Sequence, residues 1–222
     1  MSTKLCFNIK IVDFFSFYDI IFSMKRLYYK YGVMGSSKSA QALMTAFNYR
    51  QRGYNVALIK PSLDTREACE IIHSRIGLSS PCTTFAIDTD LVKLCSQIPD
   101  AQVIIVDEAQ FCTSEQIDQL KELTFSDLTV LCYGLKTNFK GLLFEGSKRL
   151  FEIAESIQEI KSICRCGAKA TMNARLKNNL VSIDGDEIDI GGDEKYEGMC
   201  YACWKKYQTT PLSDLEPNKK TP

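Results

Sequence analysis

The sequence predicts an α/β protein in which helices flank a parallel sheet, with a small cysteine-rich unit near the C-terminus. Short apolar runs such as residues 102–106 alternate with segments of helical spacing, a pattern typical of parallel strands covered on both faces. A loop of small residues with a Lys-Ser pair separates the first such strand from the first helix. Four cysteines in two close pairs mark a separate unit after the last helix.

The predicted elements follow one another from Met24 onward. We expect strands at residues 26–33, 55–60, 83–86, 102–106 and 129–133. We expect helices at residues 38–52, 89–98, 114–124 and 147–156, and a mixed loop and short helix at 64–76. Gly53 closes the first helix, Pro61 ends the second strand, and Ser114 is the expected N-cap of the third helix.

Four segments are predicted: an N-terminal extension at 1–23, a sheet domain at 24–160, a cysteine-rich unit at 161–208 and a flexible tail at 209–222. In the extension, two aspartates interrupt an apolar run, and no small-residue cleavage site follows. A translation start at Met24 would leave this extension outside the fold. A membrane-associating segment is the alternative.

The composition narrows the classes of function. Basic and acidic side chains balance at 27 each, so the net charge gives no electrostatic basis for a nucleic-acid or membrane partner. The ten cysteines are spread over a long chain, and only four of them are closely paired. This spacing indicates free thiols and a metal site rather than a disulfide scaffold. We therefore expect a protein of the reducing cytoplasm.

A phosphate-binding P-loop is predicted at residues 32–39. Gly32, Lys38 and Ser39 fit the pattern G-x-x-x-x-G-K-[ST], in which backbone N–H groups and a helix N-terminus hold the phosphates. Ser37 stands where the pattern has its second glycine, and serine there costs about 1–3 kcal/mol if φ must be positive. Taken alone, the stretch also fits an ordinary turn. The candidate phosphate ligands are Gly32, Val33, Met34, Gly35, Ser36, Ser37, Lys38 and Ser39.

Two carboxylates follow the most apolar predicted strand. Asp107 ends the run at 102–106 and Glu108 comes next, and ligands of open α/β sheets bind at such carboxyl ends of strands. Asp107 is therefore a candidate magnesium ligand together with Ser39. Glu108 is a candidate general base facing the phosphate acceptor. The simpler interpretation is that both carboxylates begin a solvated loop.

The cysteine pairs predict a structural zinc site. Cys164 and Cys166 are spaced C-x-C, and Cys200 and Cys203 are spaced C-x2-C. Two close pairs separated by a loop supply the four thiolates of a closed tetrahedral site. Four unrelated thiols are the alternative.

Together these motifs resemble the type II, zinc-containing thymidine kinases, and the C-x-C pair is similar to that of some bacterial members. The resemblance covers about residues 26 to 207. Besides the P-loop and the cysteine pairs, it is carried by Ser62-Leu63-Asp64-Thr65-Arg66, Ser74-Arg75-Ile76-Gly77-Leu78, Asp107-Glu108-Ala109-Gln110-Phe111, Tyr133-Gly134-Leu135-Lys136-Thr137-Asn138-Phe139, and Ile190-Gly191-Gly192 with Lys195-Tyr196.

The resemblance implies a P-loop kinase domain, a zinc domain whose lasso loop folds over the nucleoside base, and a homotetramer. It implies ATP with Mg²⁺ as phosphate donor and the 5′-hydroxyl of thymidine, or of deoxyuridine, as acceptor in nucleotide salvage. Glu108 would be the general base, Asp64 would join the magnesium ligands, and Arg66 would lie on the phosphate side. Asp107, Glu108, Ala109 and Gln110 would border the ATP phosphates. The nucleoside-binding residues would be Met34, Leu135, Phe139, Asn173, Asp189, Ile190 and Tyr196.

Two other functions compete with this one. A catalytically weakened nucleoside- or nucleotide-binding homologue would follow if Ser37 spoils the phosphate loop. The retention of Lys38, Ser39, Asp107 and Glu108 favours an active enzyme over that alternative. A zinc-ribbon protein that binds nucleic acid is disfavoured by the neutral charge and by the scattered lysines and arginines.

Overall fold

A six-stranded parallel sheet forms the centre of the protein in the computed structural model, which describes residues 26–62, 70–185 and 196–212. The strand order is β5-β2-β6-β7-β1-β8, and every neighbouring pair runs parallel. The strands are β1 (Leu27–Gly32), β2 (Val56–Pro61), β5 (Thr83–Phe85), β6 (Val103–Val106), β7 (Thr129–Leu135) and β8 (Ser156–Ile160).

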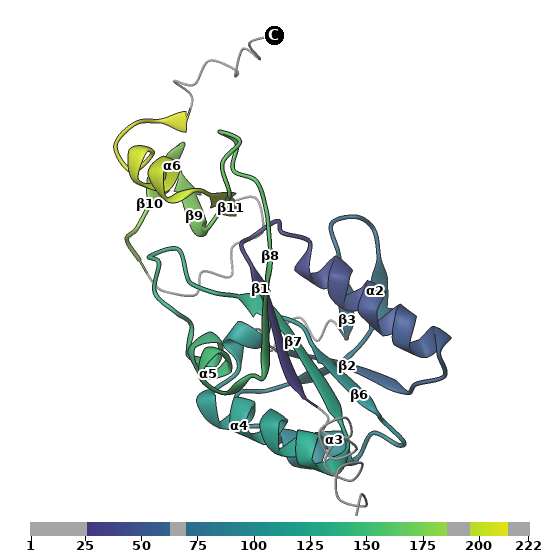
Figure 1. The fold of residues 1–222 in the computed structure, drawn as a ribbon. Helices are drawn as coiled ribbons and strands as arrows, with labels where there is room; N and C mark the ends of the chain where they lie inside the picture. The colour runs from purple at the N-terminus through teal and green to yellow at the C-terminus, as the bar shows by residue number, and fades with distance from the viewer. Residues whose placement is uncertain (1–25, 63–69, 186–195, 213–222) are drawn as a thin grey trace, which may run out of the picture.

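Helices cover both faces of this sheet (Figure 1). One face carries α2 (Lys38–Gln51) and the hairpin of β3 (Ile71–His73) and β4 (Ser79–Pro81). The other carries α3 (Leu91–Ser96), α4 (Ser114–Leu123) and α5 (Glu145–Ile153), with the short 3-10 helices η1 (Ala109–Phe111) and η2 (Thr124–Ser126).

Strand β6 shows why the sheet needs both layers. All four of its residues are buried. Ile104 and Val106 belong to the core under α3, α4 and α5, whereas Val103 and Ile105 belong to the core under α2. Successive side chains of a strand point to opposite faces, so an uninterrupted apolar run requires cover on each side.

The register of the sheet brings the phosphate loop and the two carboxylates to one edge. Gly32 at the end of β1 pairs with Leu135 of β7, and Val106 at the end of β6 pairs with Cys132 of β7. The loop after β1, the carboxylates after β6 and the turn after β7 therefore leave the sheet at the same edge, where open α/β sheets bind their ligands.

A C-terminal unit lies at this edge, beyond the ends of β1 and β8 (Figure 1). In this unit β9 (Met172–Lys177) is the central strand of a three-stranded antiparallel sheet with β10 (Leu180–Ser182) and β11 (Tyr196–Met199), and α6 (Tyr201–Lys206) follows. Its core includes Met199 and Trp204 and also contains Val33 of the phosphate loop.

The predicted α/β architecture and the predicted strands and helices of the sheet domain are confirmed. Two local expectations are wrong. The cap of α4 is Thr113, whose side chain accepts from the Gln116 N–H (3.1 Å), not Ser114. Ser156, expected to end a helix, instead begins β8, a strand that was not predicted. Of the loop and short helix expected at 64–76, residues 64–69 lie outside the described residues, and the remainder contains β3. The proposed extension at 1–23 lies outside the described residues. Within the described ranges, no helix is long and apolar enough to cross a membrane.

Candidate active site and metal centre

The phosphate loop, residues 32–39, folds around a buried lysine at the N-terminus of α2. The Ser36 N–H donates to the Val33 carbonyl (3.1 Å), and the Lys38 ammonium donates to the same carbonyl (3.0 Å). Lys38 is 7% exposed. A buried cation beside the N–H groups of a helix N-terminus is an arrangement that attracts phosphate.

Ser37 occupies the left-handed conformation that its position in the motif predicts. Its φ is 65° and its ψ is 28°, and it is the N-cap of α2. The side chain is exposed and makes no capping hydrogen bond. A residue with a Cβ atom loses about 1–2 kcal/mol in this conformation, and the Ser37 hydroxyl does not offset the loss by capping the helix.

Asp107 is a buried carboxylate next to Ser39. It is 3% exposed, the Ser39 hydroxyl donates to it, and its Oδ1 atom has no hydrogen-bond partner among the described residues. Burial, and then the negative charge of Glu108, raises the pKa of Asp107 to about 7. A partnerless carboxylate oxygen beside a hydroxyl is a donor set that suits a hard divalent cation such as Mg²⁺.

Glu108 is held in place by Gln110. Glu108 is half-buried and has a φ of 53° at the start of η1. Gln110 Nε2 donates to Glu108 Oε2 (2.5 Å), and Gln110 Oε1 accepts from the Leu135 N–H (2.9 Å). Gly134 leaves room for this amide, because a Cβ atom there would lie 2.7 Å from Gln110 Oε1. The general-base candidate is thus tied to the end of β7.

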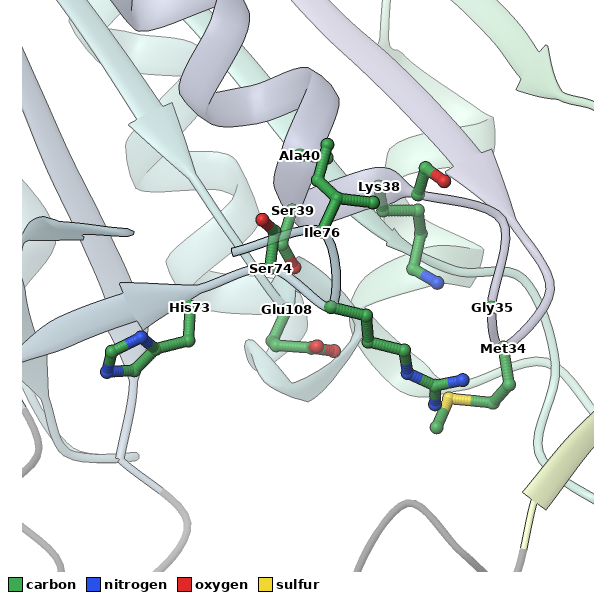
Figure 2. Close-up of a pocket in the computed structure, with 11 residues that line it drawn as sticks. Met34, Gly35, Lys38, Ser39, Ala40, His73, Ser74, Ile76 and Glu108 are labelled. Atoms are coloured by element: carbon green, nitrogen blue, oxygen red, sulfur yellow. The ribbon is translucent and has the colours of Figure 1, made fainter. Parts of the chain in front are cut away.

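A cavity of about 140 Å³ opens between the phosphate loop and the hairpin of β3 and β4. Among its lining residues, Lys38 comes from the start of α2 and Glu108 from the loop after β6, and Ser74 and Ile76 come from the hairpin (Figure 2). Ligand pockets typically span roughly 300–1,000 Å³, so this space matches the phosphate end of a nucleotide rather than a whole nucleotide. Arg75 also lines it, and its motif had been noted in the sequence without a role at the site.

The candidate nucleoside residues fall into two groups in the structure. Met34 lines the cavity. Leu135, Phe139 and Tyr196 are not among the described residues that line it. Instead, Leu135 and Phe139 are buried, and the Arg175 guanidinium lies 3.8 Å from the centre of the Phe139 ring.

The backbone of Leu135 is fixed on both sides. Its N–H donates to Gln110, and its carbonyl accepts from the hydroxyls of Tyr29 (2.8 Å) and Ser147 (2.6 Å). All three partners are buried. This network holds the point where β7 ends and the turn toward Phe139 begins. No sequence motif pointed to its two hydroxyl donors, Tyr29 and Ser147.

Several candidate residues cannot be placed or are packed inside. Asp64, Arg66, Asp189 and Ile190 lie outside the described residues. Ala109, the first residue of η1, is fully buried. Asn173 is buried in β9, and both ends of its amide are bonded to backbone groups, Met34 N–H and Thr137 carbonyl.

The four paired cysteines meet in the C-terminal unit. The sulfur atoms of Cys164, Cys166, Cys200 and Cys203 all lie within 4.8 Å of one another, and those of Cys166 and Cys200 are 3.6 Å apart. A tetrahedral zinc with Zn–S bonds of about 2.3 Å places its sulfurs about 3.8 Å apart, whereas a disulfide needs about 2.0 Å. The predicted four-cysteine cluster is confirmed, and its spacing fits a zinc ion.

Known proteins are similar to this sequence over most of its length. The family model described as thymidine kinase matches residues 25–204. Thymidine kinases from Rhodopirellula baltica and Vibrio cholerae are 39% and 40% identical to this chain, each over 82% of it and over 89% and 98% of their own lengths. The thymidine kinase of Zymomonas mobilis is 41% identical over 80% of this chain and 94% of its own. These matches do not favour a weakened binding homologue. The chain belongs to the thymidine kinase family.

Proposed function

We propose that this thymidine kinase family member transfers the γ-phosphate of ATP to the 5′-hydroxyl of thymidine, with deoxyuridine as a possible second acceptor. The observation that carries the proposal is the placement of Glu108 and Lys38 around one cavity, with Asp107 buried beside Ser39. Phosphoryl transfer needs three parts: a positive side chain for the transferred phosphate, a carboxylate for the acceptor hydroxyl, and a pair of ligands for a metal ion.

Lys38 and the phosphate loop are assigned to the phosphates of ATP. The Lys38 ammonium lies within reach of the loop backbone, so a phosphate bound there would meet both the charge and the N–H groups of the α2 N-terminus. Ser39 and Asp107 would hold Mg²⁺, and Asp64 is assigned as a further ligand. The ion would neutralise charge on the phosphates. Arg66 is assigned to the phosphate side.

Glu108 is assigned as the general base. Its carboxylate accepts the proton of the 5′-hydroxyl, the hydroxyl oxygen forms a bond to the γ-phosphorus, and the bond from that phosphorus to the β-phosphate oxygen breaks to leave ADP. Gln110 supports this assignment because it fixes one carboxylate oxygen, Oε2, and leaves the other to face the acceptor. Gln110 is a positioning residue in this scheme, since its amide is turned inward.

The thymidine is assigned to the space between Met34, the turn after β7 and the C-terminal unit. Met34, Leu135 and Phe139 would form its walls, and Tyr196, Asp189 and Ile190 would approach from the lasso. Asn173 would act on the base side through the Met34 and Thr137 backbone groups that its amide holds. A lasso that closes over the base would exclude water and limit ATP hydrolysis. Cys164, Cys166, Cys200 and Cys203 would hold a structural zinc that stabilises the root of this lasso.

The remaining assignments concern the oligomeric state, the compartment and the domain boundaries. We propose a homotetramer of the cytoplasm, with a kinase domain at 24–160, a zinc and lasso domain at 161–208, and a flexible tail at 209–222. The free thiols among the described cysteines outside the cluster, such as Cys112 and Cys132, suit a reducing compartment.

A nucleoside panel tests the function. Purified protein is incubated with ATP, Mg²⁺ and each of thymidine, deoxyuridine, deoxycytidine and deoxyadenosine, and the monophosphates are separated by chromatography. We expect thymidine monophosphate as the main product, with one ADP formed per monophosphate. Formation of ADP without any monophosphate, or a preference for a purine nucleoside, would overturn the proposal.

A further inference from the structure

The contact between the C-terminal unit and the phosphate loop carries an inference about how the two substrate sites communicate. We propose that the cross-strand pair Asn173–Gly198 is a positioning device that holds the phosphate loop and the turn after β7 together, so that occupancy of either substrate site favours binding at the other. The inference rests on the proposed function, because it concerns the ATP and thymidine sites assigned above.

The Asn173 side chain bridges two segments that are far apart in sequence. Its Oδ1 atom accepts from the Met34 N–H (2.8 Å) in the phosphate loop, and its Nδ2 atom donates to the Thr137 carbonyl (2.6 Å) after β7. Asn173 is 2% exposed, so water does not compete for these bonds. An asparagine amide offers an acceptor and a donor in one plane, which matches one N–H and one carbonyl.

Gly198 stands directly across from Asn173 and touches the same loop. The two residues are register partners between β11 and β9. A Cβ atom at Gly198 would lie 2.7 Å from Val33 Cγ2 and 2.9 Å from the Met34 carbonyl oxygen, so only glycine lets β11 approach this closely. Val33 itself is 7% exposed and packs in the core of the C-terminal unit.

These contacts give the phosphate loop two anchors. Both ends of the loop belong to the sheet domain, because Gly32 ends β1 and Lys38 begins α2. Val33 and Met34 between them are held by Asn173, Gly198 and the core of the C-terminal unit. The loop residue Met34 is also the one assigned to both substrates. A ligand that orders the C-terminal unit against Thr137 therefore also orders the Met34 backbone. Because the first substrate to bind has then already met the entropic cost of ordering this backbone, the second substrate binds without that cost.

Asparagine substitutions separate the two bonds. In Asn173→Leu both are lost, and the Met34 N–H is left without its partner. In Asn173→Asp a carboxylate oxygen still accepts from Met34, but a second acceptor faces the Thr137 carbonyl. Asn48→Leu and Asn48→Asp are the matched controls, because Asn48 is exposed on α2 and belongs to neither site.

The test is calorimetric binding to the full chain. Thymidine is titrated with and without a non-hydrolysable ATP analogue and Mg²⁺, and the ratio of the two dissociation constants is the coupling factor. We expect the unaltered protein to show a factor of about five or more, the Asn48 variants to keep it, and both Asn173 variants to reduce it to less than about two. Affinity for each substrate alone should fall by about two- to tenfold, the range of one hydrogen bond.

Gly198→Ala gives an independent perturbation of the same contact. The added methyl group must displace the Met34 carbonyl, so the coupling factor should fall although Asn173 is intact. If Asn173→Leu does not fold, Gly198→Ala still tests the inference. The inference is overturned if the unaltered protein shows no coupling, or if folded Asn173→Asp and Gly198→Ala retain it. Failure of the unaltered protein to bind thymidine at all would instead overturn the proposed function.

Discussion

Replacing Ser37 by glycine should stabilise the protein. Ser37 sits at a φ of 65°, its side chain is exposed, and its hydroxyl does not cap α2. Relief of the left-handed conformation is worth about 1–2 kcal/mol. The larger conformational freedom of glycine in the unfolded chain lowers the free energy of unfolding by about 0.4–1 kcal/mol. The net gain in the free energy of unfolding is therefore about 1 kcal/mol, which raises the Tm by about 2–4 °C for a chain of this size.

Thermal and urea unfolding of Ser37→Gly, Ser37→Ala and the unaltered protein measures this gain. Ser37→Ala keeps the Cβ atom and removes the hydroxyl, so it should stay within about 0.5 kcal/mol of the unaltered protein. A lower Tm for Ser37→Gly would refute the argument from backbone strain. A loss of about 1 kcal/mol or more in Ser37→Ala would show that the hydroxyl does cap the helix.

The same variants separate strain from obstruction at the phosphate site. The strain is present before a nucleotide binds, so its relief changes stability and leaves the ATP KM almost unchanged. A Cβ atom that hinders the approach of phosphate would act differently, since Ser37→Gly would then lower the ATP KM or raise kcat. Steady-state kinetics at saturating thymidine distinguishes the two outcomes.

Three further predictions concern the buried carboxylate, its neighbour and the metal. Burial raises the pKa of Asp107 from 3.8 to about 7, so between these pH values the folded state binds more protons than the unfolded state. The free energy of unfolding should therefore fall as the pH rises from about 4 to 7. Asp107→Asn should flatten the dependence of Tm on pH and abolish turnover. Gln110→Leu should lower kcat by about tenfold or more with little change in thymidine affinity, whereas an unchanged kcat would remove its positioning role. Cys200→Ser should lose the bound zinc found by mass spectrometry, while Cys82→Ser should keep it.

The sheet domain was predictable because its signals are local. Short apolar runs rich in β-branched residues, such as Val103–Val106, favour strands buried on both faces. Gly53 and Pro61 end their elements because of their own conformational limits. Strand β8 was missed because its pattern is polar. It lies at the edge of the sheet, where Gln158 and Ile157 are exposed, so pairing with β1 rather than apolar periodicity defines it.

The site was predictable in its residue types but not in their contacts. The motif identified Ser37 as an exception, and its positive φ is what the missing glycine implied. Nothing in the spacing could reveal that Gln110 spans Glu108 and Leu135, or that Asn173 spans Met34 and Thr137. Such bridges depend on which strands are neighbours and on the docking of one unit on the other, and both arise from tertiary packing.

Turnover of thymidine by Glu108→Gln tests the central claim most directly. The variant keeps the size of the side chain, and its amide oxygen can still accept the hydrogen bond from Gln110. It removes only the carboxylate that accepts the proton. We expect kcat to fall by at least about 100-fold and the dissociation constant for thymidine to change by less than about threefold. Glu115→Gln, at an exposed site on α4, should retain full turnover. Thymidine monophosphate formed by Glu108→Gln at the rate of the unaltered protein would contradict the account.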